Sequence, residues 1–369
     1  MIQLKSRLSA VSPKIESRFM SENGITNQKR DLKSLTYDEL EAFVTSLGEK
    51  RFRAGQLFSW LHDKRVTSFN EATSLSKEFR MRLEKEATLA VLKVRKVQTS
   101  AIDGTKKYLF ECDDGSLIES VFMPYSFGNS VCISSQVGCA CGCKFCASTV
   151  DGVKRNLTAG EMLEQIHAIC RESQEEVSRV VVMGSGEPFL NYDNLKRFIY
   201  ILSDERGMHI GRRHITVSTC GIVPRLYDAA KDFPQVNMAV SLHAAIQSKR
   251  EAIMPTAKTY HLDDIFDACK KTAEQTGRRL TFEYALMQGV NDTREDLEAL
   301  HDRLKDLPCV LNLIRVNPVR EGKFIEPNGT NVLFFQKNLE KMGINVTIRR
   351  EMGRDIDGAC GQLARRYTV

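Results

Sequence analysis

The sequence predicts an α/β protein built around a partial (β/α)6 barrel, preceded by a small helical domain and a short antiparallel β linker. Three observations predict this class. Amphipathic helical segments fill residues 31–88, alternating strand patterns fill 89–125, and six strand-then-helix units follow from residue 126. Repeated units of this kind are typical of a parallel sheet that curls into part of a barrel.

The first thirty residues precede the predicted domains. Residues 1–20 are basic, contain serine and nearly lack acidic side chains, which weakly resembles an organelle transit segment. A flexible basic extension, with Met20 as an alternative start, is the simpler interpretation. We therefore divide the chain into an extension over 1–30, a helical domain over 31–88, a β-hairpin linker over 89–125, a barrel over 126–348 and a C-terminal segment over 349–369.

Capping signals define the helical domain. Thr36 and Glu39 form a capping box before an amphipathic run that ends at Leu47 and Gly48. Further helices are predicted over 52–64 and 75–86. Its basic side chains are suited to phosphates, although a solvated helix face explains any one of them more simply.

Three short antiparallel strands are predicted between residues 89 and 123, with turns at Asp103-Gly104 and at residues 113–115. In the last strand, Glu119 shares a face with apolar residues such as Val121 and Met123. Burial would raise the pKa of this carboxyl group and make it a usable proton acceptor. The alternative is a glutamate that faces water at a strand end.

The barrel strands are predicted over 131–135, 179–183, 214–218, 236–241, 280–285 and 310–315, and a capping box at Thr158 and Glu161 begins a helix. Active sites in such barrels lie at the carboxyl ends of the strands. Four segments with polar or sulfur-containing side chains fall there: the cysteine loop at 139–146, the turn at 184–188, Ser218, and the segment 241–243.

Cys139, Cys143 and Cys146 lie within eight residues of one another. Three thiolates at this spacing can hold three irons of a [4Fe–4S] cluster and leave the fourth iron open to a substrate or cofactor. The alternatives are a zinc knuckle or ordinary buried cysteines, but no second Cys/His pair has the spacing of a zinc site. Cys141 lies too close to both neighbours to share the same cubane, so we interpret it as a bystander.

Composition limits the function classes. The chain has 369 residues, of which 42% are hydrophobic, and it contains neither a signal-peptide pattern nor an apolar run of membrane-spanning length. Eleven cysteines in such a chain indicate a reducing, cytoplasmic compartment with thiols used for metal and redox chemistry. The net charge of +6 suits a polyanionic partner without proving one.

The strand-end residues have ordinary interpretations too. A lone Gly-x-Gly is usually a tight turn, but Gly186 and Glu187 would offer a backbone edge and an acid for an amino group. Ser218 and Ser241 could be strand-end caps, and His243 is more often a packed histidine than a ligand. Their convergence at one end of the barrel favours a functional site.

The cysteine spacing, with Phe145 before the last cysteine and a Gly-Glu motif downstream, resembles the radical S-adenosylmethionine (SAM) superfamily. More narrowly, residues 31–366 resemble the RlmN family of RNA adenine carbon-2 methyltransferases. The similarity is carried by the N-terminal DLKSLTYDELEAFVTSLGEKRFRAGQLFSWL and by SSQVGCACGCKFCAST, KRNLTAGEM, VVMGSGEP, STCGIVP, VSLHA, FEYALMQGVND, the Asn317-Pro318 pair and IRREMGRDIDGACGQL.

The resemblance implies the site residues. Cys139, Cys143 and Cys146 would hold one [4Fe–4S] cluster. Cys360 matches the methyl-carrying cysteine of the family, Cys132 its second catalytic thiol and Glu119 its proton acceptor. The residues implied to position SAM are Gly186, Glu187, Ser218, Ser241, Leu242, His243 and Asn317.

The resemblance also implies the reaction and the partners. Two SAM molecules are used per turnover: one methylates Cys360, and the second activates that S-methylcysteine for addition to adenine, after which Cys132 and Cys360 form a disulfide. The implied substrates are 23S rRNA and the adenine 3′ of the anticodon in tRNAs, and residues 31–88 would be an RNA-binding domain. A flavodoxin or ferredoxin would donate electrons to a monomeric enzyme. Basic clusters suited to RNA are Lys93/Arg95/Lys96, Lys106/Lys107, Lys154/Arg155, Arg212/Arg213, Arg349/Arg350 and Arg365/Arg366.

One departure from the family pattern bears on the methylated carbon. Arg315 stands where most carbon-2 enzymes have proline. In having arginine here, the sequence resembles the related carbon-8 methyltransferases of the Cfr type. Val137, the 186–188 motif and the complete N-terminal domain favour carbon 2. A non-catalytic iron–sulfur RNA-binding protein or redox sensor is the alternative from another class, and it would neither turn over SAM nor need Cys360.

Overall fold

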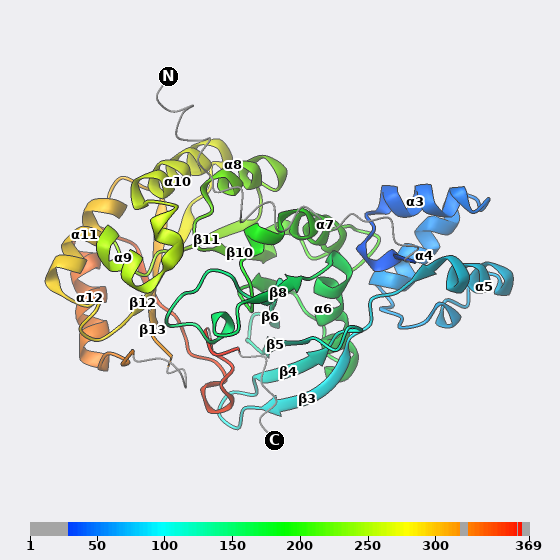
Figure 1. The fold of residues 1–369 in the computed structure, drawn as a ribbon, viewed down its shortest axis with the longest axis horizontal. Helices are drawn as coiled ribbons and strands as arrows, with labels where there is room; N and C mark the ends of the chain where they lie inside the picture. Colours follow the sequence, from blue (N-terminus) through cyan, green and yellow to red (C-terminus); the bar gives the residue numbers. More distant parts are fainter. Residues whose placement is uncertain (1–28, 318–323, 360, 364–369) are drawn as a thin grey trace.

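A ten-stranded mixed sheet forms the centre of the computed structural model, which describes residues 29–317, 324–359 and 361–363 (Figure 1). The strand order is β14-β13-β12-β11-β10-β9-β6-β5-β4-β3. The strands are β3 (Lys93–Thr99), β4 (Lys106–Glu111), β5 (Leu117–Met123), β6 (Ser130–Ile133), β9 (Arg179–Val182), β10 (Ile215–Thr219), β11 (Asn237–Ser241), β12 (Leu280–Leu286), β13 (Cys309–Arg315) and β14 (Val346–Ile348).

The parallel part of the sheet runs from β6 through β9 to β14. Its first six strands confirm the predicted partial barrel. β14 was not predicted, because a strand of three residues is too short to show alternation. The helices that follow the strands lie around the outside of the sheet (Figure 1): α6 (Ala159–Ser173), α7 (Tyr192–Leu202), α8 (Val223–Asp232), α9 (Gln247–Ile253), α10 (Leu262–Thr276), α11 (Arg294–Leu304) and α12 (Gly329–Lys341).

The antiparallel strands β3, β4 and β5 confirm the hairpins predicted between residues 89 and 123. They extend the barrel sheet, because β5 pairs antiparallel with β6 and sets Val121 opposite Cys132. The sheet therefore continues across the predicted boundary near residue 125. The domain limits drawn from the sequence stay predictions.

The predicted N-terminal helices are present as α3 (Tyr37–Ser46), α4 (Phe52–His62) and α5 (Lys77–Glu86). The Thr36 capping box begins α3, and α5, which Ser76 caps, begins at Lys77, two residues after its expected start. A short helical turn, η1 (Leu32–Ser34), docks these helices on the barrel. There the ammonium of Lys33 lies 2.5 Å from Glu164 of α6, and both side chains are fully buried.

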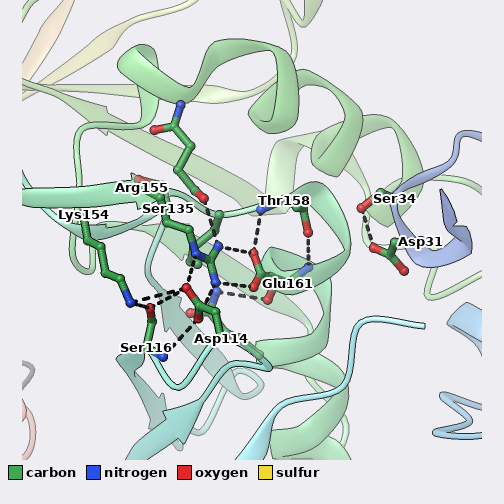
Figure 2. Close-up of polar contacts among 12 residues, drawn as sticks. Asp31, Ser34, Asp114, Ser116, Ser135, Lys154, Arg155, Thr158 and Glu161 are labelled. Carbon is green, nitrogen blue, oxygen red and sulfur yellow. Dashed lines mark hydrogen bonds and ion pairs between the residues drawn. The ribbon is translucent and has the colours of Figure 1, made fainter. Parts of the chain in front are cut away.

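A small two-stranded sheet, β7 (Gln136–Gly138) with β8 (Val153–Asn156), flanks the cysteine loop. Figure 2 shows how Arg155 of β8 joins two elements: its Nε donates to Asp114 in the β4–β5 turn (2.9 Å) and its Nη2 to Glu161 in the first turn of α6 (2.7 Å). The hydrogen bond from Arg155 lowers the pKa of Asp114. The Ser34 hydroxyl also accepts from the Gly160 amide (2.8 Å). The hairpin, the cysteine loop and the helical domain are thus tied to the start of α6.

Most buried apolar side chains of the helices and the sheet form one continuous core. A second, smaller cluster contains Val121, Met123, Cys132, Met352 and Leu363, where the hairpin meets the C-terminal segment. Among the residues that the structure describes, no helix has the length and apolar character needed to cross a membrane.

Candidate active site

Cys139, Cys143 and Cys146 line one cavity at the carboxyl ends of the parallel strands, which we call the cluster cavity. The loop that carries them turns through Gly142, whose φ of +67° lies in the left-handed region that glycine adopts at little cost. It is also fixed to the barrel, because the Lys144 amide donates to the Ile253 carbonyl (3.0 Å). The structure therefore brings the three predicted ligands together.

The thiols of this loop have unequal acidities. A hydrogen bond from Cys141 lowers the pKa of Cys139, and the same contact raises the pKa of Cys141 well above its usual value. The pKa of Cys143 is also raised well above its usual value, but here the main cause is burial. Because an iron ligand must be a thiolate, binding of a cluster here would release protons. The role of Cys141 as a bystander stays a prediction.

A tighter group of ligand atoms lies beside the loop. Those of Cys141, Glu187 and Cys220 lie within 4.8 Å of one another, and the two sulfurs are 3.7 Å apart. This group of residues differs from the predicted set of iron ligands. The ligands of a cubane bind separate irons and therefore spread more widely than the ligands of one ion.

The turn after β9 places a glycine and a carboxylate at the cavity wall. Gly186 has a φ of +109°, and a Cβ added there would come 2.7 Å from the Cβ of Gln136. Only glycine therefore fits this close approach. Burial raises the pKa of Glu187, whose oxygens accept from the amides of Cys220 (2.7 Å) and Phe189 (3.0 Å).

The next two strands supply hydroxyls and an imidazole. The hydroxyl oxygens of Ser218 and Ser241, at the ends of β10 and β11, lie 3.3 Å apart at the cavity wall. His243 accepts from the Ala285 amide through Nδ1 (3.0 Å), so its proton lies on Nε2. Burial, together with the charge of Arg250, lowers the pKa of His243 to about 3, and the ring is neutral at pH 7.

Unlike the other residues predicted to position SAM, Leu242 does not line the cluster cavity. It is fully buried, whereas Asn317 lines the cavity as expected. The backbone of Leu242 bonds to β12 through the Glu283 carbonyl (3.0 Å). Any contact of Leu242 with a cofactor stays a prediction.

Cys132 lines an adjoining cavity, which we call the thiol cavity, together with Val121, Met123 and Tyr125. The two cavities share wall residues: Met183, Ile314, Asn317, Arg349 and Leu363. Ala359 lines the thiol cavity and Gly361 the cluster cavity, while Cys360 itself lies outside the described residues.

Glu119 lies on β5, two residues from Val121 and on the same face of the sheet. Its side chain is 8% exposed, so the alternative of a glutamate facing water is wrong. The ammonium of Lys107 lies 3.5 Å from its Oε1 atom. Glu119 is beside the thiol cavity without lining either cavity.

Comparison with known proteins identifies the family. The model of the ribosomal RNA large subunit methyltransferase N-terminal domain matches residues 30–89, and that of the radical SAM superfamily matches 133–304. A protein of Lachnospira eligens named as a probable dual-specificity RNA methyltransferase RlmN is 52% identical over 337 residues, which cover 91% of this chain and 96% of the relative. The chain belongs to the RlmN family.

Other RlmN relatives agree. The Bacillus velezensis protein of the same name is 48% identical, and the match covers 92% of this chain and 94% of the relative. The crystal structure of a radical SAM methyltransferase from Sphaerobacter thermophilus superimposes with a TM-score of 0.87 at 40% identity. The superposition covers 91% of this chain and 100% of the Sphaerobacter thermophilus chain. The family and fold predicted from the sequence are confirmed.

The residues present fit the groups that an RlmN protein implies. The three cysteine thiols that line the cluster cavity suit iron, a metal that thiolates bind well. The same cavity is lined by Glu187, by the hydroxyl-bearing Ser218 and Ser241 and by the neutral His243, which can bind the polar groups of an amino acid and a nucleoside. The cavity thus has the donors for both a cluster and SAM.

Sequence reasoning missed one supporting residue of this RlmN site, Arg250, and assigned another, Arg349, to a basic cluster for RNA. Arg250 of α9 is fully buried and donates to the carbonyls of Cys220 (2.7 Å) and Leu242 (3.0 Å). Arg349 lines both cavities and lies 3.8 Å from the buried carboxylate of Glu283. In the sequence, both arginines stand in charged runs that resemble solvated surface, so no local signal marks them.

Proposed function

We propose that this RlmN-family enzyme methylates carbon 2 of an adenine in 23S rRNA and of the adenine 3′ of the anticodon in tRNAs, through an S-methylcysteine at Cys360. One observation carries the proposal: the cluster cavity and the thiol cavity adjoin, and of the two neighbours of position 360, Ala359 lines the thiol cavity and Gly361 the cluster cavity. In this proposal Cys360 takes a methyl group from SAM and delivers it to the RNA.

In this proposal Cys139, Cys143 and Cys146 hold one [4Fe–4S] cluster. The residues that hold SAM are Gly186, Glu187, Ser218, Ser241, Leu242, His243 and Asn317. When bound, the pair supplies a transferable methyl group and a 5′-deoxyadenosyl radical, and two SAM molecules are used per turnover. Because His243 is neutral, it would add no positive charge to the cavity that holds the cationic SAM.

The two cysteines outside the cluster solve a chemical difficulty. A ring carbon of adenine is not nucleophilic, so direct transfer of a methyl cation to it would be very slow. Cys360 carries the methyl carbon to the ring instead, and Glu119 accepts the proton that the ring loses. The Cys132 thiolate then attacks the Cys360 sulfur, so that the S–S bond forms and the bond from this sulfur to the transferred carbon breaks. The carbon leaves with the electron pair and takes up a proton to become the methyl group of the product, and an external reductant then reduces the disulfide and resets the enzyme.

The RNA partner is supported by charge and by family. The net charge of +6 and the basic side chains of the hairpin strand β3 favour a polyanion. The relatives named as dual-specificity RNA methyltransferases extend the proposal to rRNA and tRNA. It also includes a flavodoxin or ferredoxin as electron donor, a monomeric enzyme and a cytoplasmic location.

Arg315 favours a second candidate, methylation of adenine carbon 8. Its side chain lines the cluster cavity near Asn317, and its Nη1 lies 4.0 Å from carboxylate oxygens of both Glu326 and Glu351. This position has proline in most carbon-2 enzymes that the sequence resembles. The identity of the methylated base therefore decides between the two reactions.

The test is anaerobic incubation of the cluster-loaded protein with labelled SAM, a reductant and a 23S rRNA fragment, followed by mass spectrometry of the nucleosides. We expect 2-methyladenosine from the native chain and none from Cys360→Ala. Cys309→Ala, at a cysteine that lines neither cavity, serves as the matched control. 8-Methyladenosine would establish the second candidate. An intact cluster without any methylated base would favour a sensor protein.

A further inference from the structure

Lys107 and Glu119 share the sheet face that carries Cys132. Lys107 stands opposite Val121 in the β4–β5 pair, and Val121 stands opposite Cys132 in the β5–β6 pair. Directly opposed side chains lie on the same face of a sheet, and so do residues two apart along a strand. Lys107 and Glu119 are therefore diagonal neighbours beside the thiol cavity.

The Lys107 ammonium contacts two groups. It lies 3.5 Å from Glu119 Oε1 and donates to the carbonyl oxygen of Asp357 at 3.3 Å. The side chains of Lys107 and Glu119 are 10% and 8% exposed. Water and salt screen such a pair far less than a surface ion pair. The expectation that Lys107 forms part of a surface cluster for RNA phosphates is wrong, because the side chain is buried.

Asp357 belongs to a segment that is docked on the hairpin. The Gly353 amide donates to Asp103 Oδ2 (2.9 Å), and Asp355 Oδ2 accepts from the Ala101 amide (3.0 Å). On the far side of position 360, the Gly361 carbonyl accepts from the Ala147 amide (2.8 Å), directly after the predicted iron ligand Cys146. The flanks of position 360 are thus held by the hairpin on one side and by the cysteine loop on the other.

We propose that Lys107 is a positioning residue that joins the Glu119 carboxylate to the segment preceding Cys360. Its role as an aid to catalysis rests on the proposed function. A buried carboxylate needs a nearby cation to remain ionised, and only the ionised form can accept a proton. An ammonium has three donors, so one lysine can serve the carboxylate and the Asp357 carbonyl together.

The test compares variants of the full-length protein. Lys107→Met keeps the length of the side chain and removes its charge, while Lys107→Arg keeps the charge. Lys106→Met is the matched control, because Lys106 lies on the same strand with its side chain on the opposite face and pairs with Glu172 at 3.6 Å. Cluster content and thermal unfolding confirm that each variant is folded.

The first readout needs no activity. We measure hydrogen exchange of the amides of residues 353–359 in the cluster-loaded protein without RNA. Lys107→Met should speed exchange in this segment by about tenfold or more, since it removes an anchor of Asp357. Lys107→Arg and Lys106→Met should leave exchange near the native rate. Unchanged exchange in Lys107→Met would overturn the proposed anchoring.

The second readout separates two chemical steps. Lys107→Met should still acquire a methyl group on Cys360 but should lose at least about tenfold in single-turnover methylation of RNA, and covalent protein–RNA adduct should accumulate because the ring proton is retained. Lys107→Arg should restore the rate. If Lys107 acts through Glu119, adding Lys107→Met to Glu119→Gln should slow the reaction no further.

Equal loss of Cys360 methylation and RNA methylation in Lys107→Met, or additive effects in the double variant, would overturn a role through Glu119. Failure of the native protein to methylate any adenine would instead overturn the proposed function. In that case the exchange experiment still decides whether Lys107 anchors the segment that precedes Cys360.

Discussion

Arg250 donates a hydrogen bond of 2.7 Å from Nη2 to the carbonyl oxygen of Cys220, at the end of strand β10. The same guanidinium donates to the carbonyls of Ser241 (3.1 Å) and Leu242 (3.0 Å), at the end of β11. One buried side chain therefore links the two strand ends that present Ser218 and Ser241 to the cluster cavity. This arrangement makes the cavity wall depend on a residue that does not line it.

Arg250→Met should weaken both folding and SAM binding. It leaves three buried carbonyl oxygens without this donor, and we expect a loss of about 2–4 kcal/mol in the free energy of unfolding. The dissociation constant for SAM should rise by about tenfold or more as the strand ends relax. Urea unfolding and equilibrium binding of SAM measure the two effects. Arg294→Met, at an 88% exposed arginine, is the control. Native SAM affinity in Arg250→Met would contradict this account.

Gly186→Ala should abolish tight SAM binding. The new methyl group would meet the Gln136 side chain at 2.7 Å on a backbone with φ of +109°, so the turn must move away from the cavity wall. The matched control is Gly289→Ala, which also has a positive φ (+72°) but has open space around its Cβ position. The control should lose only about 1 kcal/mol of stability and keep SAM affinity. Equal binding defects in both variants would show that backbone strain, and not the close approach, decides the outcome.

The cysteine loop allows a direct test of the ligand set. Single Ala substitutions of Cys139, Cys143 and Cys146 should each lose most of the bound iron and sulfide, because each removes one ligand of three. Cys141→Ala should retain the cluster, since Cys141 lies too close along the chain to Cys139 and Cys143 to share the same cubane. Iron and sulfide analysis after anaerobic reconstitution measures this. Loss of iron in Cys141→Ala, matching the loss in Cys143→Ala, would make Cys141 a ligand.

The sequence predicted the parts of this site that have local signals. The spacing of Cys139, Cys143 and Cys146 and the strand-end positions of Ser218 and Ser241 can be read from short windows. Strand β14 was missed because three residues carry no period. Glu119 could be assigned to an apolar face, but its neighbour Lys107 also bonds to Asp357, 250 residues further along the chain, and no short window can reveal such a contact.

Lys107 and Arg250 show a second limit. Each stands in a run of charged or polar residues, KK and QSKRE, and such runs are usually solvated. Both are buried against groups of other elements: Lys107 contacts Glu119 and the Asp357 carbonyl, and Arg250 donates to the carbonyls of Cys220 and Leu242. Tertiary contacts of this kind bury side chains that the local composition predicts to be exposed to solvent. A buried cation is therefore the kind of site residue that sequence patterns assign least well.

The ion pair between Lys33 and Glu164 should hold the helical domain on the barrel. Lys33→Met would leave the fully buried Glu164 carboxylate without its lysine partner, and we expect a loss of about 3 kcal/mol in the free energy of unfolding. Glu164 also pairs with Arg171, so a double variant that adds Arg171→Met should be less stable than Lys33→Met alone, because it removes both of these cations from the buried carboxylate. Arg197→Met, which breaks the half-exposed pair with Glu39, should cost less than about 1 kcal/mol. A Lys33→Met variant as stable as the Arg197→Met control would refute this role.

Buried neutral histidines should make the fold weaken as the pH falls below about 6.5. Burial lowers the pKa of His167 to about 4 and that of His62 well below its usual 6.5, and these two rings lie 5.7 Å apart between the helical domain and α6. In the unfolded chain both rings take up a proton as the pH falls through 6.5, whereas in the folded protein they stay neutral until the pH reaches their lowered values. Protons therefore favour the unfolded state, and stability is full above 6.5 and declines below it.

Each such histidine contributes a slope of about 1.4 kcal/mol per pH unit below its unfolded pKa. His62→Leu removes one of them, so the difference in unfolding free energy between pH 7 and pH 5 should shrink by about 2 kcal/mol relative to the native chain. Urea titrations at the two pH values measure the difference. His214→Gln, at an exposed histidine, should leave it unchanged. If His62→Leu and His214→Gln show the same pH dependence as the native protein, the buried imidazoles do not control acid stability.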